Sequence, residues 1–257
     1  MKITALVENT SRLGFNTEHG LCLYIEALNK KILFDTGASD LFYKNALDFG
    51  IDLSLVDFLI ISHGHNDHGG GISKFLEINS TAPVYISEGA FIPRYNAKGK
   101  YIGLNAELLS SNRLVFLSSS AKIDTGITVL RLDDENLENP VCSFGLTSAQ
   151  NGVKAPDTFP DEQYLEILEN ENKVLISGCS HRGILNIARA FSPTHLIGGF
   201  HISKLPLGSE LLSLGADLNG LNTRLYTCHC TGVPQYEFLS KASNKINYIS
   251  CGDTLEI

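Results

Sequence analysis

A run of apolar residues at 56–61 constrains the fold of this chain more than any other segment. The run is nearly continuous and is bounded by polar residues, which is typical of a strand buried on both faces of a sheet. Such a strand needs layers of other elements on either side of its sheet. The polar segment HGHNDH at 63–68 follows almost at once, so it begins at the end of a buried strand.

Strand and helix patterns alternate along the rest of the chain. Short apolar runs separated by turns predict strands at 3–8, 21–26, 31–34, 83–87, 113–117, 127–132, 173–177, 194–197 and 221–227. Helical spacing predicts helices at 40–49, 72–76, 183–191 and 207–214. The segment 160–169 has helical or mixed spacing. This alternation indicates an α/β domain with helices covering the sheet faces.

The chain of 257 residues is predicted to form a single domain spanning residues 1–257. It contains no sequence repeat, no low-complexity tract and no clear linker between domains. The least regular stretch is 88–112, which we interpret as a lid or an inserted loop.

Composition and charge narrow the class of protein. Apolar residues make up 43% of the chain and charged residues 19%, which is enough apolar material for a buried core. The net charge of −8 disfavours nucleic acid as a partner. No apolar run reaches the ~20 residues needed to span a bilayer, and the N-terminal sequence does not read as a signal peptide. Six scattered cysteines favour reduced thiols, so we expect a cytoplasmic protein without a membrane partner.

The segment 63–68 has the composition of a metal site. His63 and His65 point to the same side if the segment is extended, and the following turn brings Asp67 and His68 back toward that side. Imidazole and carboxylate are ligands that zinc accepts. An exposed, His-rich loop is the alternative, but four potential ligands in six residues favour a metal site. We expect one or two zinc ions, with Mn, Fe or Mg as alternatives.

This segment resembles the His-x-His-x-Asp-His signature of the metallo-β-lactamase superfamily, and the sequence LFDTG at 33–37 matches its strand-end Asp-Thr-Gly. The whole chain resembles a subgroup of metal-dependent hydrolases that includes dihydropteroate-synthase-like enzymes. The segments that carry this similarity are 18–20, 62–71, 177–181, 198–201 and 227–232. The resemblance implies a four-layer αββα sandwich of two mixed sheets flanked by helices.

The resemblance also implies roles for individual residues. His63 and His65 would bind a first metal ion, and Asp67 and His68 a second. The superfamily completes the first site with a histidine from the middle of the chain, but residues 100–175 contain none. His181 is therefore the candidate substitute.

Two further positions depart from the superfamily or leave alternatives open. Cys179 stands where the superfamily has a bridging Asp, and it is either a thiolate ligand or a small buried residue. His229 is the better match for the last ligand by its order along the chain. His201 competes for that role and would otherwise contact substrate, so we assign it a catalytic role beside Asp67. A separate structural zinc site at 228–230 is disfavoured, because neighbouring side chains alternate between faces.

Three residues outside the signature have weaker interpretations. His19 is placed at the mouth of the site, with an exposed turn as the alternative. Asp35 is expected to orient the metal-binding loop through hydrogen bonds. His195 precedes a strand and is interpreted as structural.

These features predict an enzyme that hydrolyses a small, anionic ester or phosphoester with metal-activated water. No Gly-x-Ser-x-Gly elbow supports a serine hydrolase, and no phosphate-binding Walker loop is present. Arg94, Lys98 and Lys100 are candidates for binding the substrate anion, although an exposed charged loop is the simpler explanation for these three. His19 is the fourth candidate for contacting the substrate.

Two other functions stay open. The resemblance implies a transferase that condenses a pterin pyrophosphate with an aminobenzene ribose phosphate and releases pyrophosphate. The third possibility is a metal-binding sensor without catalytic activity. The sequence does not predict the oligomeric state.

Overall fold

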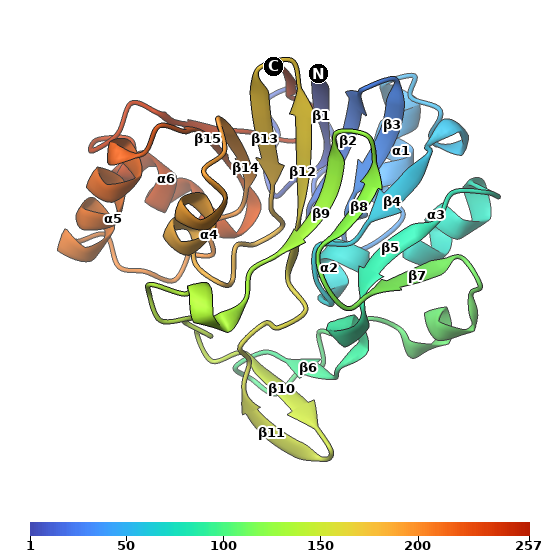
Figure 1. Ribbon diagram of the computed structural model, residues 1–257, viewed down its shortest axis with the longest axis horizontal. Coiled ribbons are helices and arrows are strands. Elements are labelled where there is room, and N and C mark those ends of the chain that lie inside the picture. The colour runs from blue at the N-terminus through green and yellow to red at the C-terminus, as the bar shows by residue number, and fades with distance from the viewer.

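The computed structural model describes all 257 residues, and two seven-stranded sheets form its centre (Figure 1). The strand order of the first sheet is β17-β1-β2-β3-β4-β5-β7. Its strands are β1 (Lys2–Val7), β2 (Cys22–Ala27), β3 (Lys30–Phe34), β4 (Phe58–Ile60), β5 (Val84–Ser87), β7 (Leu114–Leu117) and β17 (Thr254–Glu256). The strands from β3 to β7 are parallel and the others antiparallel, so this sheet is mixed.

The second sheet has the order β16-β15-β14-β13-β12-β9-β8. Its strands are β8 (Ala121–Asp124), β9 (Ile127–Arg131), β12 (Gln163–Glu169), β13 (Asn172–Ile176), β14 (His195–Gly198), β15 (Arg224–Thr227) and β16 (Ile246–Tyr248). Here β13 to β16 run parallel, and β8, β9 and β12 are antiparallel to their neighbours.

Helices cover the outer face of each sheet (Figure 1). The first sheet is covered by α1 (Leu41–Asp48) and α3 (Ile72–Ile78), and the second by α4 (Ile184–Phe191), α5 (Ser209–Gly220) and α6 (Val233–Leu239). The four-layer αββα sandwich expected from the sequence is therefore confirmed. The apolar side chains between the two sheets form one buried cluster of 19 residues, which joins the sheets into one body.

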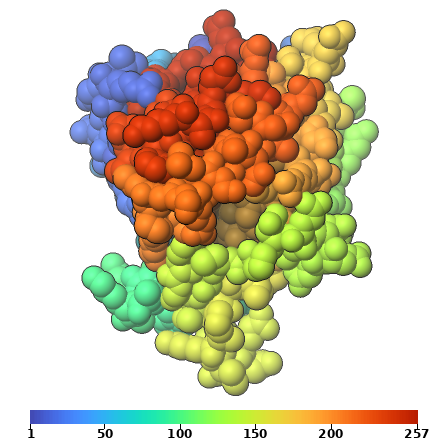
Figure 2. All heavy atoms as spheres, turned by 90° about the vertical axis from the view of Figure 1, so that its left-hand side faces the viewer, coloured from blue at the N-terminus to red at the C-terminus, as the bar shows by residue number.

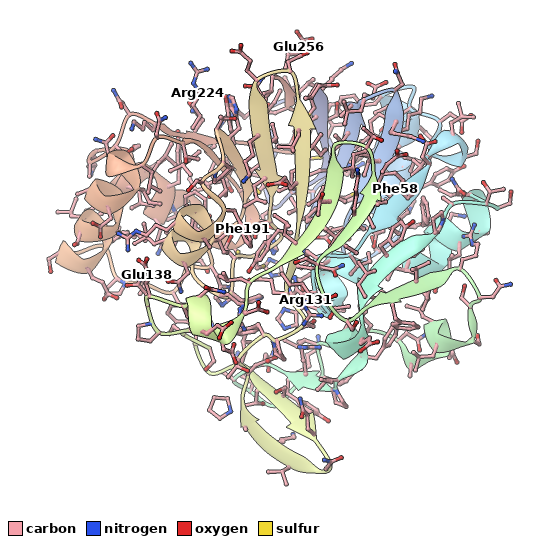
Figure 3. The ribbon with its side chains drawn as sticks, viewed as in Figure 1. Phe58, Arg131, Glu138, Phe191, Arg224 and Glu256 are labelled. Carbon is pink, nitrogen blue, oxygen red and sulfur yellow. The ribbon has the colours of Figure 1, made fainter.

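The strand β4 shows why the run at 56–61 is apolar throughout. Phe58 and Ile60 point into the core between the sheets, and Leu59 points toward the helices α1 and α3. Phe58, marked in Figure 3, packs edge-on against Tyr85 of the neighbouring strand with ring centroids 6.0 Å apart. All three β4 side chains are thus buried, as expected for a strand covered on both faces.

Several elements differ from the sequence-based prediction. Most of the segment 160–169 forms the strand β12, which begins at Gln163, because its side chains alternate between the two faces of a sheet. The short elements β6 (Arg94–Tyr95), β8, β16, β17 and α6 were not predicted. The hairpin of β10 (Thr147–Gln150) and β11 (Val153–Pro156) was also missed, because its residues are polar or exposed.

The stretch 88–112 contains 3₁₀ turns at Glu88–Phe91 and Ala106–Ser110 as well as β6. β6 pairs with β10, so this stretch and the hairpin form a third, small sheet of three strands. This sheet projects below the sandwich in Figure 1. Its role as a lid stays a prediction. The remaining 3₁₀ turns are Leu53–Leu55, Asp134–Asn136 and His229–Thr231, and a single helical turn, α2, spans Asn66–Gly69.

Arg131 ties the two large sheets together at one edge. It ends β9 in the second sheet, as Figure 3 marks. Its Nη1 atom donates to Ser87 Oγ at 3.0 Å and to the carbonyl oxygen of Leu117 at 3.2 Å, both in the first sheet.

None of the helices combines the length and the apolar character that a bilayer span requires.

The alternation along β12 yields a test of the core. Ile167 is fully buried between the sheets, whereas the next residue, Leu168, is 48% exposed. Ile167→Ala should lower the free energy of unfolding by about 2–5 kcal/mol, since it leaves a cavity. Leu168→Ala is the matched control, with an expected change of about 0.5 kcal/mol or less. Equilibrium unfolding in urea measures both, and equal effects would contradict the assigned register.

Candidate metal centre

The candidate site lies where strands of both sheets end. β3 and β4 of the first sheet lead into Asp35 and the segment 63–68. β13, β14 and β15 of the second sheet lead into Cys179, His201 and His229. Because each of these sheets is parallel in this region, the loops after its strands gather at one edge, where α/β proteins bind ligands. The site is therefore assembled from two halves, one from each sheet.

Three buried imidazoles form the first group of candidate ligands. His63 Nε2 lies 2.9 Å from His65 Nδ1 and 3.2 Å from His181 Nε2. His181 thus occupies the place beside His63 and His65 that the sequence suggested for it. All three side chains are buried.

The second group adds a carboxylate and a thiol. His68 Nε2 lies 3.2 Å from His229 Nε2 and 3.2 Å from Cys179 Sγ. Asp67 Oδ2 is 3.4 Å from His229 Nε2 and 3.9 Å from His68 Nε2. Of the two late histidines, His229 is therefore the one that joins this group.

Cys179 connects the two groups. Its Sγ atom lies within 4.8 Å of candidate ligand atoms in both, His63 and His181 on one side and His68 and His229 on the other. This is the position where the superfamily has its bridging Asp. The location favours the ligand interpretation of Cys179 over that of a small core residue.

The spacing and chemistry of these atoms fit metal ions. Nitrogen ligands at ~2.0–2.1 Å from a tetrahedral zinc ion stand roughly 3.3 Å apart, close to the separations of 2.9 and 3.2 Å observed here. Burial lowers the pKa of His63 and His181 well below the usual value and that of His65 to about 3. These imidazoles are therefore neutral at pH 7, as metal ligands must be.

The second group has the opposite electrostatic character. Burial opposes a charge on His68, but Asp35 and Asp67 raise its pKa to about 9. Burial likewise opposes a charge on Asp67, yet His68, His19 and His229 hold its pKa well below the usual value. This half of the site attracts positive charge, which a metal ion would supply in place of the proton.

Hydrogen bonds fix the orientation of most of the imidazoles. Asp35 Oδ2 lies 2.7 Å from His68 Nδ1 and also accepts from Ser62 Oγ, while Asp35 Oδ1 accepts from Ser62 N, both at 2.7 Å. Ser62 Oγ is 2.9 Å from His63 Nδ1. Asp35 is thus the buried orienting residue that the sequence suggested, in the role such carboxylates play around metal ligands.

Other positioning residues were not foreseen. Glu8 Oε1 accepts from His229 N at 2.6 Å, and Asn9 Oδ1 lies 2.9 Å from His229 Nδ1. Glu162 Oε1 accepts from His181 N at 2.6 Å. Phe159 stacks on His181 with ring centroids 4.0 Å apart. No motif marks these residues. A carboxylate at the end of the predicted strand 3–8, Glu8, is the one signal the sequence offered.

His19 and His201 flank the cluster. His19 is 70% exposed on its side chain, and its Nε2 atom lies 3.3 Å from Asp67 Oδ2, so it stands at the mouth of the site. The His201 ring packs 4.0 Å from that of His181, and neither of its nitrogens has a hydrogen-bond partner.

Cys230 is a further residue that sequence reasoning missed. Its thiol accepts a hydrogen bond from His201 N at 3.2 Å. The potential ligand atoms of Cys230, His201 and Cys179 lie within 4.8 Å of one another. Cys228, two residues earlier, points instead into the core between the sheets. The two thiols therefore face different sides, which argues against a separate structural zinc site at 228–230.

The candidate substrate residues in the basic stretch need a correction. Arg94 is buried, and its guanidinium is engaged by Asp157, Asp161 and three backbone carbonyls. Arg94 therefore has a structural role and is not an anion receptor, because its guanidinium is buried and already held by two carboxylates. Lys98 and Lys100 are exposed near the turn after β6 and form no ion pair; their role stays a prediction.

His195 lies at the start of β14, at the other end of the strand from the cluster. It packs on Tyr226 with ring centroids 6.3 Å apart, and its Nδ1 atom is 3.0 Å from Thr194 Oγ1. The environment agrees with the structural interpretation of this histidine.

Comparison with known proteins agrees with this geometry. Residues 16–148, just over half of the chain, match the metallo-beta-lactamase superfamily. The chain belongs to this superfamily. A crystal structure described as Tm1679, a metal-dependent hydrolase of the beta-lactamase superfamily, is 31% identical with a TM-score of 0.85, over 100% of this chain and 99% of that one. The metallo-beta-lactamase fold protein YhfI from Bacillus subtilis, 16% identical with a TM-score of 0.62, shares the fold over 100% of this chain and 98% of its own.

Two proteins of Methanocaldococcus jannaschii are similar over most of their length. An uncharacterized protein is 28% identical over 96% of this chain and 96% of its own. The 7,8-dihydropterin-6-methyl-4-(beta-D-ribofuranosyl)-aminobenzene-5'-phosphate synthase is 28% identical over 90% of this chain and 88% of its own. The proteins similar to this chain thus include one described as a metal-dependent hydrolase and one named as a synthase.

The hydrogen bonds of Asp35 predict its effect on metal binding. Asp35→Asn should weaken zinc affinity by about 10–100-fold. The amide has no negative charge and only one acceptor oxygen, so it cannot accept hydrogen bonds from Ser62 and His68 as the carboxylate does. Competition with a chromophoric chelator measures the affinity. Asp48→Asn, an exposed change on α1, is the control. Unchanged affinity in Asp35→Asn would remove Asp35 from the site.

The ion pairs of Arg94 predict a loss of stability. Arg94→Gln should lower the free energy of unfolding by about 3–5 kcal/mol, since it leaves Asp157 and Asp161 buried without their cation. Lys98→Gln, at an exposed position, should change it by about 0.5 kcal/mol or less. Urea unfolding compares the two. A stable Arg94→Gln protein with a raised KM would restore the substrate-binding interpretation.

Proposed function

We propose that this protein is a metal-dependent hydrolase that cleaves a small, anionic ester or phosphoester with metal-activated water. The observation that carries the proposal is the convergence of two ligand groups on one thiol, Cys179, at the edge of the sandwich. Membership of the superfamily and the similarity to a protein described as a metal-dependent hydrolase support it.

In this proposal the ligands divide between two zinc ions. His63, His65 and His181 would hold the first, and Asp67, His68 and His229 would hold the second, with Cys179 as a further ligand within reach of both groups. Nitrogen, carboxylate and thiolate donors suit zinc better than they suit magnesium. Zinc bound there would polarise the scissile group and lower the pKa of a water molecule toward ~7.

The remaining residues of the site handle protons and substrate. Asp67 is 18% exposed on its side chain, so its carboxylate reaches the mouth of the site and can accept a proton there. His19 lies 3.3 Å from Asp67 Oδ2 and is mostly exposed, which gives the proton a route to solvent. His201 lines the site beside His181 and is proposed to contact the substrate.

The partner in this proposal is a small molecule, and not a nucleic acid, because the chain carries a net charge of −8. The six cysteines are all free, which suits a reducing compartment. We therefore propose a cytoplasmic location.

A transferase is the second candidate, because one relative over most of the chain is named as a synthase. The same residues would then serve the departure of pyrophosphate from a pterin pyrophosphate, with an aminobenzene ribose phosphate as acceptor. Incubation with both compounds separates the two functions. Hydrolysis yields the free pterin alcohol whether or not the acceptor is present, whereas transfer yields a coupled product and needs the acceptor.

Substitution of one ligand in each group tests the proposal. His63→Ala and His68→Ala should each lose about one zinc equivalent and lower kcat/KM by about 1000-fold or more on phosphoesters, lactones or pterin phosphates, because each removes a ligand of the reacting centre. Elemental analysis and steady-state kinetics measure the two effects. His195→Ala is the matched control, since this histidine lies away from the cluster. Loss of zinc without loss of turnover, or no turnover on any of these substrates, would favour the sensor.

A further inference from the structure

A pocket of about 460 Å³ adjoins the candidate metal centre. Its walls are the N-terminal turn of α4, one face of α5 and the segment 139–144. Figure 2 shows this side of the molecule, where a hollow lies between the orange helix α5 and the yellow-green segment below it. A cavity of this size holds a small organic group.

The inner end of the pocket reaches the site. His181, a candidate ligand of the first metal ion, lines the pocket together with His201. The two imidazoles are in contact, with ring centroids 4.0 Å apart. A molecule reacting at the metal centre can therefore extend its unreactive part into this pocket.

The helix α5 supplies the outer wall. Glu210, Ser213, Leu214 and Asp217 all line the pocket, and their spacing places them on one face of the helix. Two of these four are carboxylates. Apolar side chains, among them Phe144 and Phe200, make up much of the opposite lining.

No lysine or arginine is among the 18 lining residues. Of the cations nearby, Arg182 is buried and paired with Asp134, whereas Lys204 Nζ donates to the carbonyl oxygen of Phe144 at 2.9 Å and keeps its charge. The two carboxylates of the lining thus outnumber this one ammonium group. The pocket therefore combines apolar walls with a negative rim. Such a lining disfavours a phosphate or carboxylate and favours a neutral or positively charged group.

We propose that this pocket binds the unreactive arm of the substrate, and that this arm is an apolar body that is uncharged or carries an amine. The inference rests on the proposed function, and it limits the anionic part of the substrate to the group that reacts at the metal centre. Glu210 and Asp217 select against a second anionic group, and Ser213 lines the same wall between them.

Binding of three small probes to the zinc-loaded protein tests the pocket without turnover. The probes are 2-phenylethylamine, 2-phenylethanol and phenylacetate, which share a ring and differ in charge. Ligand-observed NMR gives their dissociation constants. Ser213→Trp fills the pocket and should weaken the amine and the alcohol by about tenfold or more. Leu212→Trp, exposed on α5 but outside the lining, is the control and should leave both unchanged.

Removal of the rim charges tests the selectivity. Only the binding that Ser213→Trp abolishes is counted as binding in the pocket. For this binding, the double variant Glu210→Gln/Asp217→Asn should show a preference for the amine over phenylacetate that is about fivefold smaller at low salt. Asp48→Asn/Glu237→Gln changes the net charge equally at exposed positions away from the pocket and should not alter this preference.

The inference is overturned if Ser213→Trp leaves amine and alcohol binding unchanged, or if phenylacetate is the probe that Ser213→Trp displaces most. Failure of the proposed function has a different signature. In that case the zinc-loaded wild-type protein turns over no ester or phosphoester, while the amine and alcohol still bind in a way that depends on Ser213.

Discussion

The first half of the site depends on the hydrogen bonds that the buried carboxylate of Asp35 makes with Ser62 and His68. Asp35 follows β3 directly, has a left-handed backbone with φ of 60°, and is fully buried. Its two oxygens contact the backbone and hydroxyl of Ser62 and the ring of His68, so β3 holds the segment that follows β4. A carboxylate buried this deeply is tolerated because both of its oxygens are hydrogen-bonded, with three partners in all.

The layered fold explains why the other half must come from far along the chain. The cluster between the sheets fixes the first sheet against the second, and Arg131 links them at one edge. The loops after β13 and β15 then meet the segment 63–68. Each group of candidate ligands takes side chains from both halves, so the two groups are complete only when both sheets have packed.

How far the sequence predicts this site depends on where its residues lie. The segment 63–68 was predictable because its ligands are adjacent, and the missing histidine in 100–175 pointed to His181. Four supporting residues were not predictable, because they reach the site from segments next to other strands, and contact between distant segments leaves no periodic signal in the sequence. These residues are Glu8, Asn9, Phe159 and Glu162. Arg94 was misread for the same reason: its two acidic partners lie more than sixty residues later.

The two halves of the site also differ in charge, and Cys179 lies on the boundary between them. The first group consists of neutral imidazoles, whereas Asp35 and Asp67 make the second strongly attractive to a cation. Burial raises the pKa of the Cys179 thiol, so its thiolate needs an adjacent positive charge. A cation held by Asp67, His68 and His229 would supply that charge. Occupation of the second group would thus favour the thiolate form of Cys179, which also lies within reach of the first group, so binding at the two positions would be coupled.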